Sequence, residues 1–160
     1  MELVVTDSTV LAFSIAVFLL IIYSFDDLRT RKVPNQFVFM GLFVSLAIGL
    51  QTGRFIEHAL LHLTAALLTL TLGYVLFRIG ALGGADVKIL FTISILSPGI
   101  EFANWENPIL EGILIVGLLF MIPLIVGYLI SQRKTDEGDV IPLIPVILGT
   151  YLVLQLLALF

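Results

Sequence analysis

Long apolar runs, broken by short polar stretches, dominate the pattern along this chain. The runs cover residues 8–25, 35–51, 57–79, 87–99, 108–130 and 140–159, and Leu, Ile, Val, Phe and Ala fill them almost continuously. A helix on the surface of a soluble protein would instead carry polar residues on one face. Crossing a hydrocarbon core about 30 Å thick takes roughly 20 apolar residues, and several runs approach or exceed that length. The pattern therefore predicts an all-α, polytopic membrane protein with about six transmembrane helices.

Composition supports this fold class and limits the domain organisation. Of the 160 residues, 59% are hydrophobic and 12% charged, whereas about a quarter of the residues in an ordinary soluble domain are charged. Little sequence remains between the runs, so residues 1–160 are predicted to form a single transmembrane domain. The chain has no cysteine, which excludes disulfides, thiolate metal sites and a cysteine nucleophile.

The basic residues predict how the chain is oriented in the membrane. Seven of the eight fall in stretches on one side of the predicted helices, namely Arg29, Arg31, Lys32, Arg78, Lys88, Arg133 and Lys134. Arg54 falls on the other side, together with Glu2, Asp7, Glu57, Glu101 and Glu106. By the positive-inside rule both termini are then outside, and the protein is a multi-pass protein of the cell membrane. Short basic clusters beside helices form no continuous basic face, so nucleic acid is not expected as a partner.

Two short polar islands each place an aspartate at the edge of an apolar run. Residues 27–35 read Asp-Leu-Arg-Thr-Arg-Lys-Val-Pro-Asn, and residues 83–88 read Gly-Gly-Ala-Asp-Val-Lys. An ionised carboxylate at such a boundary is costly unless it has a partner or a function. The predicted topology puts both Asp27 and Asp86 on the cytoplasmic side.

The fourth run suggests a cavity beside the second aspartate. It begins at Val87 and is broken by Pro98-Gly99, which leaves about 11 residues and roughly 17 Å of helix. A helix that starts after Gly83-Gly84 would leave non-helical backbone and Asp86 near membrane depth. Such backbone is tolerated where it lines a protein-walled, wet cavity. We expect a cleft there that faces the cytoplasm.

Two neighbouring carboxyl groups could hydrolyse a peptide bond. One must be ionised to take a proton from water, and the other must be protonated to polarise the scissile carbonyl. Like charges a few ångströms apart favour that split, and the pair then titrates as a unit. A purely structural alternative stays open at this point: Asp27 could balance the basic residues that follow it, and Asp86 could cap its helix.

The two islands resemble the paired motifs of the type IV prepilin peptidase family. Residues 27–35 resemble its first motif, an aspartate followed by a basic stretch and Pro34-Asn35. Residues 83–88 are similar to its Gly-x-Gly-Asp motif, which preflagellin peptidases share and presenilin-type proteases share more distantly. The resemblance extends to the proline-containing segment around Pro145 and to the order of the helices. It thus covers most of the chain.

The supporting residues also follow from this resemblance. The spacing to Pro34 selects Asp27 over its neighbour Asp26, and Pro34 with Asn35 would start the second helix. Gly83 and Gly84 would give a flexible helix start. Ala85 departs from the family motif, since it replaces a glycine and disfavours a positive φ. Lys88 lies two residues past Asp86, roughly opposite on a helix, so an ion pair between them is not expected.

The resemblance implies a membrane aspartyl endopeptidase that uses Asp27 and Asp86 as a dyad. Its substrates would be precursors of type IV prepilin-like proteins or preflagellins, which carry a basic leader before an apolar helix. Cleavage of this class III signal peptide would occur at the cytoplasmic face, among membrane lipids. The absence of cysteines and the short chain favour the compact, peptidase-only members of the family. No cofactor and no metal are implied, and the oligomeric state is not predicted.

Other functions fit the same composition less well. A small proton-coupled transporter or channel could use two aspartates as proton carriers, but both lie near one face and no relay crosses the membrane. A non-catalytic assembly factor would tolerate the loss of both carboxylates. His58 and His62 share a helix face four residues apart, but they lack the glutamate spacing of a zinc protease and lie away from the aspartates.

Overall fold

Seven helices and one short strand pair make up the computed structural model, which describes residues 2–3, 5–133 and 142–156. The helices are α1 (Asp7–Thr30), α2 (Asn35–Gln51), α3 (Arg54–Glu57), α4 (Ala59–Arg78), α5 (Gly84–Leu96), α6 (Pro108–Arg133) and α7 (Ile144–Leu156). The strands β1 (Glu2–Leu3) and β2 (Ala103–Asn104) pair antiparallel over two residues each. The predicted all-α fold is confirmed.

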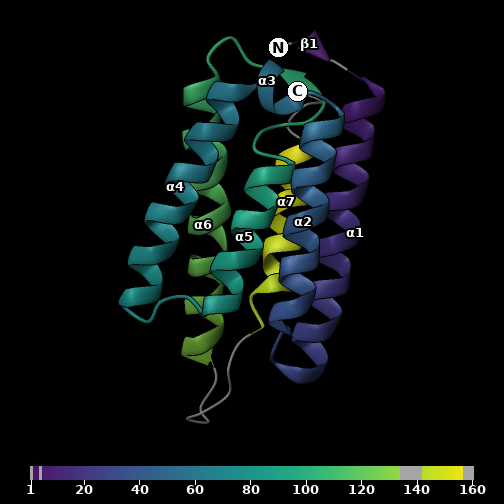
Figure 1. Cartoon of the computed structure of the whole chain (residues 1–160). Helices are drawn as coiled ribbons and strands as arrows, with labels where there is room; N and C mark the ends of the chain where they lie inside the picture. Colours follow the sequence, from purple (N-terminus) through teal and green to yellow (C-terminus); the bar gives the residue numbers. More distant parts are fainter. Residues whose placement is uncertain (1, 4, 134–141, 157–160) are drawn as a thin grey trace.

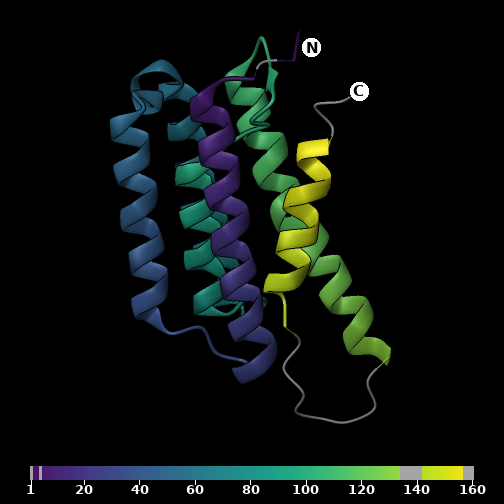
Figure 2. The ribbon, with the colours of Figure 1, turned by 90° about the vertical axis from the view of Figure 1, so that its right-hand side faces the viewer.

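The long helices form one bundle, with the short α5 at its centre (Figure 1). Helix α5 packs against α2 on one side and α4 on the other, while α1 packs against α7 and α6 contacts both α4 and α7. The bundle has two ends (Figures 1 and 2). We call the end that holds residues 26–34 and 79–86 the aspartate end. The opposite end holds residues 52–58 and 97–107.

Three of the helices, α1, α4 and α6, are long and apolar enough to cross a membrane. Helices α2 and α7 are apolar but shorter. Large apolar side chains such as Phe18, Phe43 and Leu50 are exposed on the outside of the bundle, as expected for a surface that meets lipid. The protein is therefore a membrane protein, whereas six crossings and outside termini stay predictions.

The helix boundaries differ from those predicted at three places. Helix α1 continues to Thr30 rather than ending near residue 25, so Asp27 lies within the helix. The predicted run 57–79 is divided, because His58 has non-helical φ and ψ between α3 and α4. Helix α5 begins at Gly84, which places Asp86 in its first turn. The ends of apolar runs do not mark helix ends, since polar residues such as Asp27 and Asp86 can also be helical.

The short α5 ends inside the bundle, and the loop after it is buried. Ser97, Ile100 and Glu101 are each 5% exposed or less. Buried backbone groups need partners, and side chains from other elements supply them. The Ile100 and Glu101 N–H groups donate to Glu111 and Gln155 respectively, Gln155 also donates to the Gly99 carbonyl, and Arg54 donates to the Leu96 carbonyl. The sequence-based expectation concerned the backbone before α5, and it did not foresee this buried loop after it.

Candidate active site at the aspartate end

Both motif aspartates lie at the same end of the bundle. Asp27 is on the last two turns of α1 and Asp86 is in the first turn of α5. The two side chains are half-buried, and they are close enough for the charge of Asp27 to raise the pKa of Asp86. No hydrogen bond joins the two carboxyl groups among the described residues. The fold therefore brings together two aspartates that are 59 residues apart.

The start of α7 holds the carboxylate of Asp27. The N–H group of Ile144, the first residue of α7, donates to Oδ2 of Asp27 over 3.2 Å. The N-terminus of a helix carries unpaired N–H groups and a partial positive charge, so it favours an anion. The positive charge of Arg31, which ends α1 in a left-handed conformation, also favours the ionised form of Asp27. Burial acts in the other direction and is the strongest of these influences, so the pKa of Asp27 is raised above its ordinary value.

Asp86 is held at the start of its own helix. The N–H group of Gly83 donates to Oδ2 of Asp86 over 3.1 Å. This is the helix-capping role that the sequence leaves open for Asp86 as an alternative to catalysis. Asp86 precedes the predicted membrane segment 87–99. Burial raises the pKa of Asp86 to about 6, the Gly83 N–H opposes that rise, and the negative charge of Asp27 adds to it. Near neutral pH this carboxyl group can exist in both protonation states.

A cavity of about 720 Å³ opens beside Asp86. Its wall combines the turn before α5, the part of α6 after Pro123, and the residue before α7. The lining residues are Gly80, Ala81, Leu82, Gly83, Asp86, Leu124, Gly127, Tyr128, Ser131 and Leu143. A volume of this size suits a short peptide segment better than a single water or ion. A cavity is thus present beside Asp86, as expected, whereas its opening toward the cytoplasm stays a prediction.

The glycine motif accommodates its departure at position 85. Ala85 lies inside α5, and Arg31 is the one non-glycine residue with a positive φ in the described part of the chain. The conformation that only glycine adopts is therefore not required at Ala85. Gly83 is restricted for another reason, because a Cβ atom there would lie 2.9 Å from Oδ2 of Asp86. Gly84 has ordinary van der Waals space for a methyl group.

The other predicted supporting residues lie at the same end. Pro34 is the N-cap of α2 and Asn35 its first residue, as the sequence predicts. Lys88 donates from Nζ to Oδ1 of Asn35 over 2.8 Å, and so links the two motifs. Pro145 is the second residue of α7, where its missing N–H leaves no gap in the helix hydrogen bonds.

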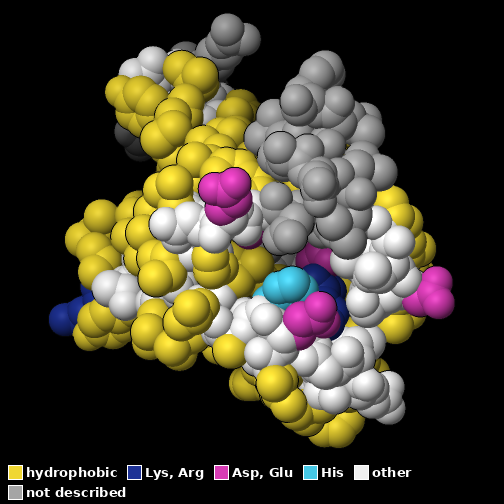
Figure 3. All heavy atoms as spheres, turned by 90° about the horizontal axis from the view of Figure 1, so that it is seen from above, with side chains coloured by type: hydrophobic (Ala, Val, Ile, Leu, Met, Phe, Trp, Pro, Cys, Tyr) yellow, Lys and Arg dark blue, Asp and Glu magenta, His cyan; other side chains and the backbone are white. Residues whose placement is uncertain are grey.

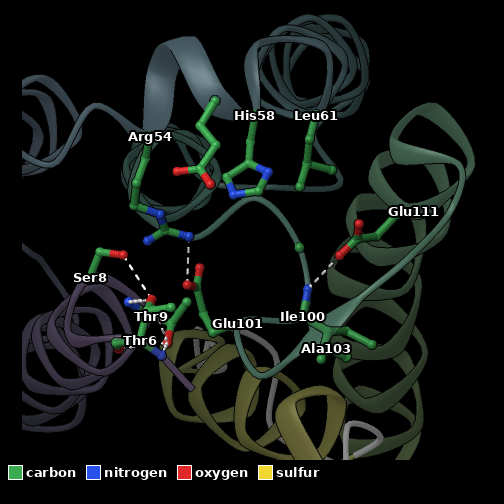
Figure 4. A pocket seen from close by; sticks show the side chains of 12 residues that line it. Thr6, Ser8, Thr9, Arg54, His58, Leu61, Ile100, Glu101, Ala103 and Glu111 are labelled. Carbon is green, nitrogen blue, oxygen red and sulfur yellow. Dashed lines mark hydrogen bonds and ion pairs between the residues drawn. The ribbon is translucent and has the colours of Figure 1, made fainter. Parts of the chain in front are cut away.

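Sequence reasoning missed a polar cluster at the opposite end. A smaller cavity of about 190 Å³ lies there, lined by residues that include Thr6, Arg54, Glu57, His58 and Glu101. Seen from above, charged side chains and a histidine gather in this hollow (Figure 3). Arg54 and Glu101 form an ion pair over 2.6 Å, and both are at least 94% buried (Figure 4). The only sequence signal was an isolated arginine among acidic residues.

The two histidines play different roles at that end. His58 is exposed at the start of α4, whereas His62 is buried against the ring of Phe55. Within the described ranges no group of three or more His, Cys, Asp or Glu residues could hold a metal ion. The histidines therefore give no metal centre in that part of the chain.

Comparison with known proteins yields one finding. The model of the type IV leader peptidase family matches residues 14–160, a segment that includes both aspartate motifs and the start of α7. No curated protein and no solved structure matches the chain.

Proposed function

This chain belongs to the type IV leader peptidase family, and from that premise we propose that it is an aspartyl endopeptidase with Asp27 and Asp86 as its catalytic pair. The observation that carries the proposal is the geometry of the aspartate end. The negative charge of Asp27 there raises the pKa of Asp86, and a cavity large enough for a short peptide opens beside Asp86. The family implies a protease, and these are its best-placed candidate residues.

The surroundings of the two carboxyl groups suggest different roles. Burial raises the pKa of both carboxyl groups, that of Asp86 to about 6, which makes Asp86 the better general acid. The Ile144 N–H and the charge of Arg31 stabilise the ionised form of Asp27, which makes Asp27 the better general base. Water would attack the scissile carbonyl carbon and give a proton to Asp27, while Asp86 gives its proton to the carbonyl oxygen. When the C–N bond breaks, Asp27 passes its proton to the leaving amine. Asp86 recovers a proton from the hydroxyl group of the intermediate.

The proposed substrates are prepilin-like or preflagellin precursors, with a basic leader followed by an apolar helix. Five basic residues lie at the aspartate end, namely Arg29, Arg31, Lys32, Arg78 and Lys88, and Arg54 lies at the opposite end. This distribution supports a cytoplasmic aspartate end in the cell membrane. The apolar substrate helix would then lie in the bilayer, with the bond before it at the level of the two aspartates.

Co-expression with a candidate precursor tests this function. We expect the precursor to be cut once, between its basic leader and its apolar segment, and N-terminal sequencing of the product locates that bond. A strain without this chain should accumulate the uncut precursor. A precursor that is processed equally in both strains would contradict the proposal, and so would proton flux in proteoliposomes without any cleavage.

Adding a methyl group at Gly83 should impair catalysis without unfolding the protein. In Gly83→Ala the new Cβ would displace the Asp86 carboxyl group, because only 2.9 Å separate the two positions. A displacement of about 1 Å can cost on the order of 100-fold in rate. The measurement is kcat on a precursor peptide in detergent or liposomes. Gly84→Ala is the matched control and should cleave normally, because its Cβ meets only Phe77, at 3.4 Å.

A further inference from the structure

We propose that Asn35 and Lys88 are positioning residues that fix the separation of Asp27 and Asp86 through the first turn of α2. This inference rests on the proposed function of the two aspartates. It assigns the Pro-Asn motif and the lysine after the second aspartate a shared task. Neither side chain needs to touch substrate for that task.

The helices that carry the two aspartates barely touch each other. Direct contact between α1 and α5 is slight, whereas α2 packs along α5. Direct α1–α5 packing can therefore do little to hold the distance between the two carboxyl groups. Packing between α1 and α2 is slighter still, so individual side-chain contacts rather than helix packing must couple the two aspartates. The start of α2 makes such a contact with each of the two helices.

Helix α1 is fastened to the first turn of α2 by Tyr23. Its buried hydroxyl donates to the carbonyl oxygen of Phe37 over 3.0 Å. The same hydroxyl occupies the space that a Cβ atom at Gly41 would fill, so the Tyr23 side chain reaches the backbone of α2. Tyr23 precedes Asp27 by four residues and thus lies on the same face of α1.

Helix α5 is fastened to the same turn by Lys88. Its Nζ donates to Oδ1 of Asn35 over 2.8 Å, and it lies 5.9 Å from the ring centre of Phe39. A hydrogen bond from a charged donor is stronger than a neutral one, and the nearby aromatic ring adds a cation–π contact. The first turn of α2 is therefore held from both sides, by a residue near each aspartate.

Lys88 acts by holding Asn35 and not by setting the ionisation of Asp86. It follows Asp86 by two residues and so points away from it on the helix. The groups that set the ionisation of Asp86 are its burial, the Gly83 N–H and the charge of Asp27 from α1. Tyr128 of α6 is a further titratable group that lines the cavity beside Asp86.

A double-mutant cycle tests the proposal. Lys88→Met and Asn35→Ala should each lower kcat about tenfold with little change in KM, and the double variant should lose no more than either single variant. Arg78→Met is the matched control: it removes a positive charge at the same end, from an exposed side chain without a hydrogen bond to the described residues. It should cleave at the wild-type rate. Losses that multiply in the double variant would overturn the proposal.

The pH profile gives a readout that simple destabilisation would not move. If the two aspartates separate, the charge of Asp27 raises the pKa of Asp86 less, so the alkaline limb of kcat shifts to lower pH. Asn35→Asp keeps an acceptor for Lys88 and should preserve both rate and profile. If the alkaline limb of kcat stays at the wild-type pH in the two single variants, the proposal is overturned. If those variants fail to fold, a loss of activity in well-folded Asn35→Asp would also overturn it. Wild-type chain that cleaves no precursor would instead refute the proposed function itself.

Discussion

Asn in place of either Asp27 or Asp86 should lower the rate of precursor cleavage by about three orders of magnitude. Removing a general acid or base costs on the order of 10²- to 10⁴-fold, and the two groups act in one proton-transfer cycle. The amide cannot take a proton from water at position 27, and it is a far weaker proton donor than a carboxylic acid at position 86. The measurement is single-turnover cleavage of a labelled precursor by purified variants.

Asp26→Asn is the control for that experiment. It removes the same charge one residue away, from a half-buried side chain that forms no hydrogen bond within the described residues. We expect wild-type cleavage from this variant and normal binding of the uncut precursor by the two inactive variants. Full cleavage by Asp27→Asn or Asp86→Asn would refute the dyad, and loss of cleavage in Asp26→Asn would show that the motif was assigned to the wrong aspartate.

The sequence predicts which residues meet better than it predicts what holds them. Two motifs at the edges of apolar runs were enough to predict that Asp27 and Asp86 share one end of the bundle. The partner of Asp27, the Ile144 N–H, lies 117 residues away. Every residue except proline has a backbone N–H group, so no pattern of side chains could show which of these groups binds Asp27. The predicted helix boundary near residue 25 also hid that Asp27 faces α7 from within α1.

The length of the fourth run carried more information than its composition. A run of about 11 residues cannot span the membrane comfortably, and this length predicted non-helical backbone and a cleft beside Asp86. It did not reveal the buried loop at the other end of α5. The loop after α5 is the buried one, because the polar groups that satisfy it, on Arg54, Glu111 and Gln155, come from three other elements. Only the folded chain shows that these distant polar residues converge.

Arg54→Met should destabilise the protein strongly while leaving its chemistry intact. The substitution leaves the buried carboxylate of Glu101 without its charged partner (Figure 4). Breaking one side of a buried ion pair costs about 3–5 kcal/mol, a large part of the stability of a typical domain. Thermal or denaturant unfolding in detergent measures the loss. Because Arg54 lies at the end opposite the aspartates, kcat per folded molecule should not change.

The stability lost in Arg54→Met should also depend on pH, and it should be larger at high pH. Burial raises the pKa of Glu101 from its ordinary 4.5 to about 7 even with Arg54 present, and removal of Arg54 raises it further. Between pH 4.5 and the folded-state pKa the folded protein binds more protons than the unfolded chain, so its stability falls as pH rises. Arg54→Met should therefore lower the free energy of unfolding more at pH 8 than at pH 5.

A second substitution and a control test this explanation. Arg54→Met/Glu101→Gln removes the unpaired charge and should recover much of the lost stability at pH 8. The exposed control Glu57→Gln should change the stability little. Equal destabilisation at both pH values would show that packing, rather than the buried charge, makes Arg54 necessary.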